Sequence, residues 1–568
     1  MPLGILEDHK LEHVPGTSPL NDLTGQGGTE AADGIDRGLL KRDPSGEIVL
    51  VPQPSDSPND PYNWPRWKKE MFTVAIAYGC GCVGAVGPLL TSAIVPLAED
   101  FGVPLQRFTL GLQGSCIVAI AVGSLLLNTL AVKIGKRPVY IATSLGLMAT
   151  CFWAAEAKSF ASLAAARAVQ GFCMAPMEAL VPASISDIWN QPGFPIAGAI
   201  IQYSSYRVAL HAMGGAFVLQ TILTVLFMPE SAFHRAGALD IDTGDKAVVV
   251  DGMTEKGSTQ HHEDSRRGSV PSESEPKKSF AREMLPYDGY WDKVSFWRTL
   301  ILPFFMLASP IVVWGTLLFT TCISWLVLIS ITLSQIFSAP PYNFSVASVG
   351  ASNMSSFVAS LIGTAVAGPC FLIFTATGFF AWGQSLHSQD PWPIPVIVCM
   401  GLINLGVQLG TTGLVVYVTD CHRKESSEAF AIMNFIKNLF AFGLTFYCND
   451  WIAVQGVRDC FFVIGGITVA VSLTTIPMYI FGKKARSFTY RHRVRSGQYI
   501  IAFCFSPPAE KKKGHNGEED GTHDAASDAA FAAADKPDFF SVPAFAPETL
   551  EPSVGSGNPT VYDGIDIE

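Results

Sequence analysis

Charge is what this chain lacks most. Only 15% of its 568 residues are Asp, Glu, Lys or Arg, and the 88 residues from Thr299 to Leu386 contain none of these and no histidine. A water-exposed domain could not remain soluble with such a stretch, whereas a helix of roughly 20 apolar residues crosses the hydrocarbon core of a bilayer. The run has room for three or more such helices, and it therefore indicates a polytopic membrane protein.

Several motifs are also missing. The chain has no CxxC pair, no HExxH and no GxxxxGKS sequence, so the usual signatures of zinc or thiol sites, zinc peptidases and P-loop ATPases are absent. Most of the 12 cysteines lie in apolar runs and are expected to be small buried hydrophobes. No cluster of catalytic residue types stands out. We therefore expect a protein that is not an enzyme and that binds no metal, cofactor or nucleic acid.

Apolar runs are present on both sides of a polar central segment. In addition to the uncharged run, they are Met71–Ala98, Phe108–Leu130, Val139–Ala155, Phe160–Ile185, Val208–Met228, Ile394–Thr419, Ala429–Cys448 and Cys460–Phe481. Basic residues gather in every second connection, and the intervening connections have few of them. By the positive-inside rule, this alternation predicts that both termini and the central segment are cytosolic.

Composition divides the chain into five parts. They are a disordered cytosolic N-terminal tail (1–65), an N-terminal helical bundle (66–230), a cytosolic central loop (231–297), a C-terminal helical bundle (298–485) and a disordered cytosolic C-terminal tail (486–568). Two membrane halves joined by a polar loop are typical of transporters built from repeats.

Two positions interrupt this pattern. Phe194–Ile201 supplies only eight apolar residues, about 12 Å of helix, where the alternation requires a fifth span. Gly363–Phe374 contains no polar turn, although a cytosolic loop is due there. We expect a truncated fifth helix and a missing loop between helices 8 and 9. A mis-predicted intron boundary or a real, shortened protein would each produce this pattern.

Six segments carry the resemblance: Asp60–Lys69, Leu130–Arg137, Arg167–Gly171, Gly193–Gly198, Val418–Arg423 and Asn434–Asn438. Together they resemble fungal major facilitator superfamily transporters of the 12-helix drug:proton antiporter type. In that family the first four correspond to the segment before the first helix, the loop between helices 2 and 3, the RxxxG pattern of helix 4 and part of the helix 5 antiporter motif, and the last two are similar to segments of the polyamine and drug exporter branch. Val132 stands where the family usually has Asp. The resemblance covers roughly residues 58–485. It implies an all-α membrane protein with two six-helix bundles around a central cavity, alternating access and proton coupling.

We therefore expect a secondary active transporter that exports small cationic or amphipathic solutes, such as drugs, polyamines or secondary metabolites. The proton gradient would replace any cofactor. The expected setting is the lipid bilayer of the plasma membrane, with the protein as a monomer that binds a small-molecule substrate. An uptake carrier, a transport-inactive sensor or scaffold, and the product of a faulty gene model stay open as alternatives.

Charged residues inside the spans are the candidates for chemistry, since each costs about 2.5–3.5 kcal/mol on insertion scales. Glu178 lies eleven residues after Arg167, about 16 Å along a helix, and is the candidate for exchanging a proton against a cationic substrate. Arg167 would act in a proton relay or in cavity electrostatics, or it would snorkel from the helix end. Lys437 is equally deep and would repel or release a cation, bind an anion or form a structural ion pair. Whether it pairs with Glu178 stays open.

Further candidates are assigned by position. Gating roles are expected for four residues of the loop between helices 2 and 3 and for two acids at cytosolic span ends, namely Lys133, Gly135, Lys136, Arg137, Asp187 and Asp420. Side chains that could line a cavity are Gln220, Trp325, Gln408 and Tyr417. Ser269 follows Arg266-Arg267-Gly268 and suits a basophilic kinase, and Pro310 is expected to kink the seventh span.

Overall fold

The structure is a computed structural model of the chain. It describes residues 57–188, 206–233, 277–290, 295–365, 371–422 and 425–489, except Pro88 and Asp288, and the single positions Leu6 and Ser55. Within these ranges all regular elements are helices. The predicted all-α class is confirmed.

Eight helices form the described part of the N-terminal half. They are α2 (Arg66–Val86), α3 (Ile94–Asp100), α4 (Leu105–Thr109), α5 (Ser115–Ile134), α6 (Lys136–Ala155), α7 (Phe160–Ala179), α8 (Val181–Ser186) and α9 (Tyr206–Phe227). Helices α2 and α3 belong to one long span, as do α4 and α5. The sharp turn between α5 and α6 occurs at Gly135, whose φ of 96° is a conformation that glycine adopts without steric cost.

Eight further helices follow the central segment, which itself contains the short helix α11 (Phe280–Glu283). They are α12 (Phe296–Phe305), α13 (Pro310–Ser338), α14 (Val346–Ala365), α15 (Phe371–His387), α16 (Met400–Cys421), α17 (Ser426–Leu444), α18 (Cys448–Gln455) and α19 (Val457–Leu473). The uncharged run thus forms most of α12, all of α13 and α14, and all of α15 except His387.

The described residues contain seven helices that are long and apolar enough to cross a membrane, or eight if α17 and α18, bent by 50°, make one span. The last of these spans runs from Val457 to Thr489, so it passes residue 485, the expected end of the C-terminal bundle. The parts where we expect a truncated fifth helix and a missing loop, residues 189–205 and 366–370, lie outside the described residues.

The expected kink at Pro310 is wrong. Ser309 adopts an extended conformation with ψ of 121°, and Pro310 is the first residue of α13. Proline fits that position because the first residues of a helix need no backbone N–H donor. The chain therefore changes direction at a break between two helices and not within one.

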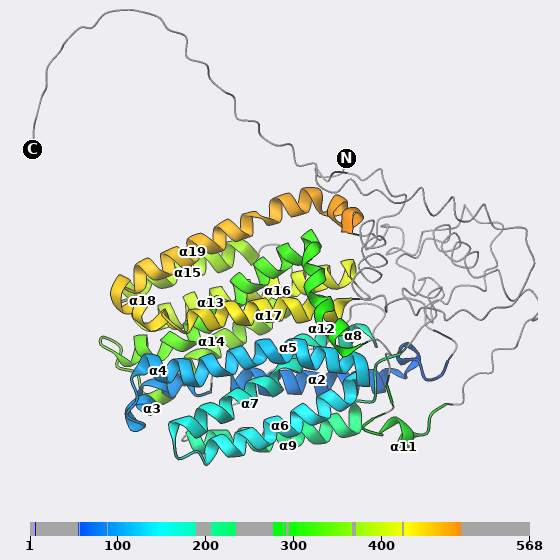
Figure 1. Cartoon of the computed structure of the whole chain (residues 1–568). Helices are drawn as coiled ribbons and strands as arrows, with labels where there is room; N and C mark the ends of the chain where they lie inside the picture. Colours follow the sequence, from blue (N-terminus) through cyan, green and yellow to red (C-terminus); the bar gives the residue numbers. More distant parts are fainter. Residues whose placement is uncertain are drawn as a thin grey trace, which may run out of the picture. The chain divides into compact units, whose positions relative to one another are not determined.

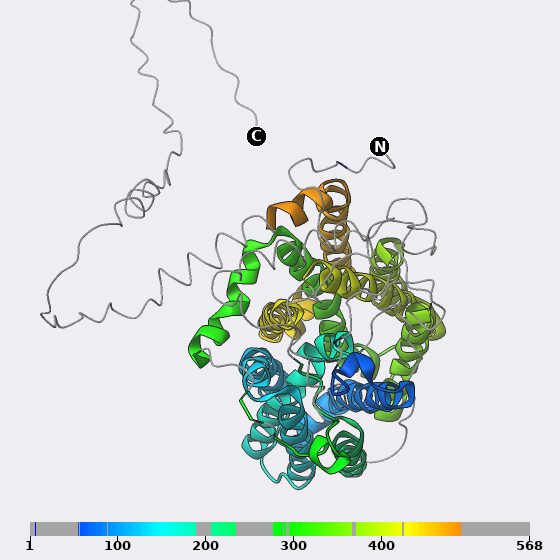
Figure 2. The ribbon, with the colours of Figure 1, turned by 90° about the vertical axis from the view of Figure 1, so that its right-hand side faces the viewer.

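The two halves repeat the same helix pairing. In the N-terminal half α5 packs against α7 and α6 against α9, and in the C-terminal half α14 packs against α16 and α15 against α19. The halves meet where α5 runs along α17 and where α13 contacts the short turn Thr91–Ala93. Figures 1 and 2 show the blue-to-cyan helices of the first half beside the green-to-orange helices of the second.

The outer face of α9 illustrates the membrane environment. Five large apolar side chains recur along it at helical spacing and are 38–48% exposed: Val218, Leu219, Ile222, Val225 and Leu226. In water such a stripe would require a partner, because soluble proteins seldom expose large apolar patches. In a bilayer it is the surface that contacts lipid.

Candidate functional site

The two deepest charged residues predicted from the sequence form an ion pair between the halves. Glu178 lies at the end of α7, and Lys437 lies in α17. The Lys437 Nζ is 2.6 Å from Glu178 Oε2, with 7% and 26% of the two side chains exposed. The pairing that the sequence left open is therefore present, and it joins elements 259 residues apart.

Proline explains why the chain at Glu178 can bind a neighbouring helix. In a continuous helix the Glu178 carbonyl would accept from the backbone N–H four residues later, but that residue is Pro182, which has none. Helix α7 ends at Ala179, and the Asn434 Nδ2 of α17 donates to the Glu178 carbonyl at 3.3 Å. The break thus ties the main chain of α7 to the opposite half.

The face of α17 that meets Glu178 carries three polar residues. Asn434, Lys437 and Asn438 stand three and four positions apart and so share one side of the helix. Asn438 Nδ2 donates to the carboxylate oxygen that also accepts from Lys437, at 3.3 Å. The Lys437 Nζ lies 5.6 Å from the centre of the Phe319 ring in α13. Three helices therefore meet around one ammonium group.

Arg167 does not snorkel, because its side chain is completely buried in the N-terminal half. Its guanidinium donates to the carbonyls of Val86 and Gly87 at the end of α2, at 3.2 and 2.9 Å, and to the side-chain oxygens of Gln170 and Gln113, at 2.6 and 3.3 Å. The last carbonyls of a helix have no intrahelical donor, and Arg167 supplies one from α7. This clamp fixes the point at which the first span breaks.

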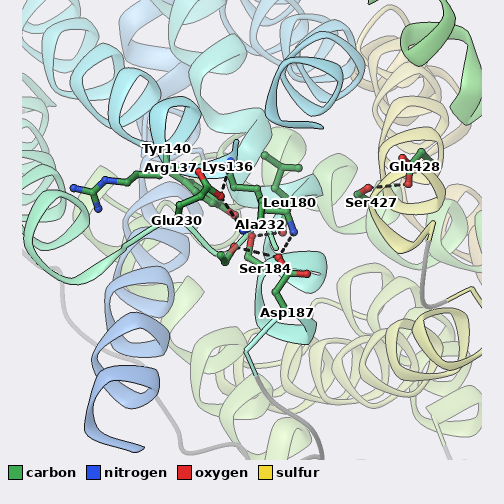
Figure 3. A network of polar contacts seen from close by, with 11 residues as sticks. Lys136, Arg137, Tyr140, Leu180, Ser184, Asp187, Glu230, Ala232, Ser427 and Glu428 are labelled. Carbon is green, nitrogen blue, oxygen red and sulfur yellow. Dashed lines mark hydrogen bonds and ion pairs between the residues drawn. The ribbon is translucent and has the colours of Figure 1, made fainter. Parts of the chain in front are cut away.

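A second polar network lies at one end of the helix bundle, the end where α8 and α11 are found (Figures 1 and 3). Lys136 Nζ lies 2.7 Å from Asp187 Oδ2. The Glu230 carboxylate accepts from the first backbone N–H groups of α6, those of Lys136 and Arg137, at 3.1 and 3.0 Å. A carboxylate is favourable at a helix N-terminus because the N–H groups there are otherwise unpaired. Burial raises the pKa of Glu230, and these backbone donors and the Lys136 charge partly offset the rise.

Arg137 extends this network to the central loop. It donates to the carbonyls of Val225 and Met228 at the end of α9, and to those of Met284 and Leu285, which follow α11, at 2.8 and 3.1 Å. The neighbouring Lys68–Glu283 pair, at 2.7 Å, also connects the first span to α11. The end of the central loop is thus fastened to the N-terminal half.

The gating candidates therefore divide into two groups. Lys136, Arg137 and Asp187 come together in this network next to the Gly135 turn, and Lys133 is buried one turn earlier in α5. Asp420 lies in the last turn of α16 in the other half.

The cavity candidates lie mainly against other side chains of their own half. Gln220 is fully buried and donates to Thr224, and Gln408 donates to Thr412. Trp325 packs edge-on against Phe440, and Tyr417 against Trp314, each with 5.9 Å between ring centres. Ser269 lies outside the described residues.

Sequence reasoning gave no site role to Phe319, Glu230 or Glu428, and it named Asn434 and Asn438 only as the ends of a segment that resembles a family motif. The amide spacing around Lys437 is a signal that could have located Asn434 and Asn438. Glu428 is 8% exposed in the first turn of α17 and accepts from the Ser427 hydroxyl at 2.8 Å. Both Glu230 and Glu428 lie at helix ends, where acidic residues are common, so the sequence pattern does not distinguish them from other acids.

Comparison with known proteins shows which family the chain resembles. The family model for the Major Facilitator Superfamily matches residues 73–192. Protein HOL1 of Saccharomyces cerevisiae is 24% identical over 557 residues, covering 80% of this chain and 93% of HOL1. The cercosporin MFS transporter CTB4 of Cercospora nicotianae is 24% identical over 471 residues, covering 76% of this chain and 87% of CTB4. The chain is thus similar to transporters of the major facilitator superfamily.

Similarity to the superfamily agrees with the paired halves described above. The solved structure of the proton:xylose symporter XylE covers 73% of this chain and 97% of XylE, with 12% identity and a TM-score of 0.49. The membrane-spanning helices of the described residues and the similarity to major facilitator transporters together indicate a multi-pass membrane transporter. The identity of its solute, the coupling ion and the direction of transport belong to the proposal that follows.

Proposed function

We propose that the protein is a proton-coupled secondary transporter that exports small organic cations or cationic amphipaths in exchange for protons. The observation that carries this proposal is the Glu178 carboxylate, which lies between the two halves and remains 26% exposed. One carboxylate holds either a proton or a cation. Binding of one therefore excludes the other, which is the requirement for exchange.

The ion pair also offers a link between binding and movement. Glu178 and Lys437 come from opposite halves, and alternating access requires the halves to move relative to each other. A proton on Glu178 removes the charge that holds Lys437 and so weakens a contact between the halves. The pair thereby couples protonation to rearrangement, because it stabilises one arrangement of the two halves more than the other.

One comparison supports the solute class. A relative is named as a transporter of cercosporin, which favours a small organic solute such as a drug or secondary metabolite, with polyamines as the simplest cationic class. We place the protein in the plasma membrane as a monomer with both termini in the cytosol. A kinase acting on Ser269 of the central loop belongs to the same proposal, which needs no cofactor and no catalytic chemistry.

The experiment is transport of radiolabelled spermidine into proteoliposomes that carry the full-length protein and an imposed proton gradient. Glu178→Gln should lower proton-driven flux to that of protein-free liposomes, because the amide cannot exchange a proton. Glu156→Gln is the matched control, since Glu156 is 71% exposed beside His211 at the end of α6. It should transport as the wild type does.

The direction of the gradient separates the alternatives. Exchange predicts that spermidine moves against the proton flow, and a proton-coupled uptake carrier would move it with that flow. Wild-type protein that transports nothing under either gradient would favour a sensor or scaffold. Full flux in Glu178→Gln would refute the role of Glu178 in coupling.

A further inference from the structure

The surroundings of the Lys437 ammonium group have the features of a binding site for a cation. The ammonium lies 2.6 Å from a carboxylate oxygen and 5.6 Å from the centre of an aromatic ring. Carboxylates and aromatic faces are the two groups by which proteins commonly attract organic ammonium ions. In this structure both groups are taken up by a side chain of the protein itself.

We infer that Lys437 is a tethered competitor of the substrate, and that a substrate binds by placing a primary ammonium group where the lysine ammonium now lies. This inference rests on the proposed function, because it requires Glu178 to be the cation-binding carboxylate. It adds the chemical class of the substrate head group and a role for Lys437.

Displacement of the ammonium does not require movement of its helix. The backbone of Lys437 is held within α17, and its carbonyl accepts from the Ser324 hydroxyl of α13 at 3.4 Å. The charge stands at the end of a flexible four-carbon side chain that can rotate away. The carboxylate that it leaves is still partly exposed, so a solute can reach it.

The geometry favours a primary ammonium over a quaternary one. A distance of 2.6 Å between nitrogen and oxygen is that of a charge-assisted hydrogen bond, which needs an N–H donor. A quaternary ammonium has no such donor, and its methyl groups keep the charge farther from Glu178. It would retain only the attraction to Phe319 and the general charge attraction.

Return of the lysine ammonium to Glu178 would also help release. A site with a strong carboxylate and nothing to replace the solute would hold the solute too tightly for rapid turnover. Lys437 offers Glu178 an alternative partner once the halves have moved. Affinity and turnover should therefore respond in opposite directions to removal of its charge.

The test measures binding of two matched probes, hexylammonium and hexyltrimethylammonium, to the purified full-length protein by calorimetry near neutral pH. The wild type should prefer hexylammonium. Lys437→Gln should bind hexylammonium about tenfold more tightly, because the competing charge is gone, and in proteoliposomes it should show a lower KM and a lower kcat. Lys437→Arg keeps the charge and should bind no more tightly than the wild type.

Two further variants complete the experiment. Lys158→Gln removes a positive charge from an exposed position and should leave binding unchanged. Phe319→Leu tests the same binding position without altering charge, and it should weaken hexylammonium binding about threefold, as expected for loss of a cation–π contact. This variant keeps the test decisive if Lys437→Gln does not give a monodisperse protein.

The outcomes distinguish this inference from the proposed function. If Glu178→Gln abolishes proton-driven flux while folded Lys437→Gln binds hexylammonium no better than the wild type, Lys437 is only a structural partner and the inference is wrong. Unchanged binding in Phe319→Leu would also overturn it. If Glu178→Gln retains full flux, the proposed function fails and the inference fails with it.

Discussion

At the scale of single residues, Glu230 has a measurable pH signature. Its pKa in the folded protein is raised above the ordinary value of 4.5, chiefly by burial. Between 4.5 and the raised pKa, the folded state binds more protons than the unfolded state, so stability should fall as pH rises through this window. Glu230→Gln has no such group, and its unfolding midpoint in detergent should depend less on pH than that of the wild type.

The difference between the two proteins isolates Glu230, because all other titrating groups are common to both. Glu156→Gln removes an exposed carboxylate instead and should retain the wild-type pH dependence. Parallel curves for wild type and Glu230→Gln would show that the burial of Glu230 has no consequence for stability.

Buried charged residues differ in how easily they can be predicted from the sequence. Glu178 and Lys437 stand out because charges within apolar spans are costly and therefore rare. Their contact does not follow from the sequence, since it depends on which helices meet across the halves. Glu428 is nearly as buried as Lys437, and Glu230 is half-buried as Glu178 is, but these two acids begin or follow a span, where an acid is ordinary.

At the scale of elements, the helices could largely be predicted from apolar runs, whereas the breaks within them could not. Pro310 begins a helix instead of kinking one, because an extended Ser309 precedes it. Helix α11 has four residues and no apolar run, so nothing in a polar loop marks it. Its position depends on contacts with Lys68 and Arg137, which come from distant parts of the chain.

The Lys68–Glu283 ion pair is expected to hold α11 in place. Lys68→Glu should place two carboxylates side by side and release α11, and Glu283→Lys in the same chain should restore the pair in reverse. Loss of a charge-assisted hydrogen bond of about 1.5 kcal/mol corresponds to roughly tenfold less protection from hydrogen exchange at residues after Phe280.

Hydrogen exchange read by mass spectrometry measures this directly in the full-length protein. Arg66→Glu is the control, because the partner of Arg66 among the described residues is Glu70, on an exposed part of α2 where 85% of the Arg66 side chain is accessible. It should leave α11 protected. Equal protection in the Lys68→Glu variant would mean that the carbonyl contacts of Arg137 hold α11 without the ion pair.

At the scale of the whole molecule, two halves could be predicted from the central loop, but the contacts between them could not. The end of the helices opposite α11 shows this clearly (Figure 1). Gln106 of α4 donates to the carbonyl oxygens of Thr445 and Phe446, where α17 ends and the chain bends. Asn449 of α18 donates to Gln106 Oε1 at 3.0 Å and to Thr109 at 3.2 Å. Neither amide belongs to a motif.

These contacts join the halves at one end, so alternating access requires them to open during each cycle. We therefore expect that holding Gln106 and Asn449 together stops transport. In a Gln106→Cys, Asn449→Cys double variant, a short bifunctional thiol reagent with a reducible bond should lower flux to background, and reduction should restore it. Each single variant, treated identically, controls for the native cysteines and should keep its flux. Full transport by the cross-linked protein, verified by mass spectrometry, would show that this end stays closed throughout the cycle and that the halves separate only at the end near α11.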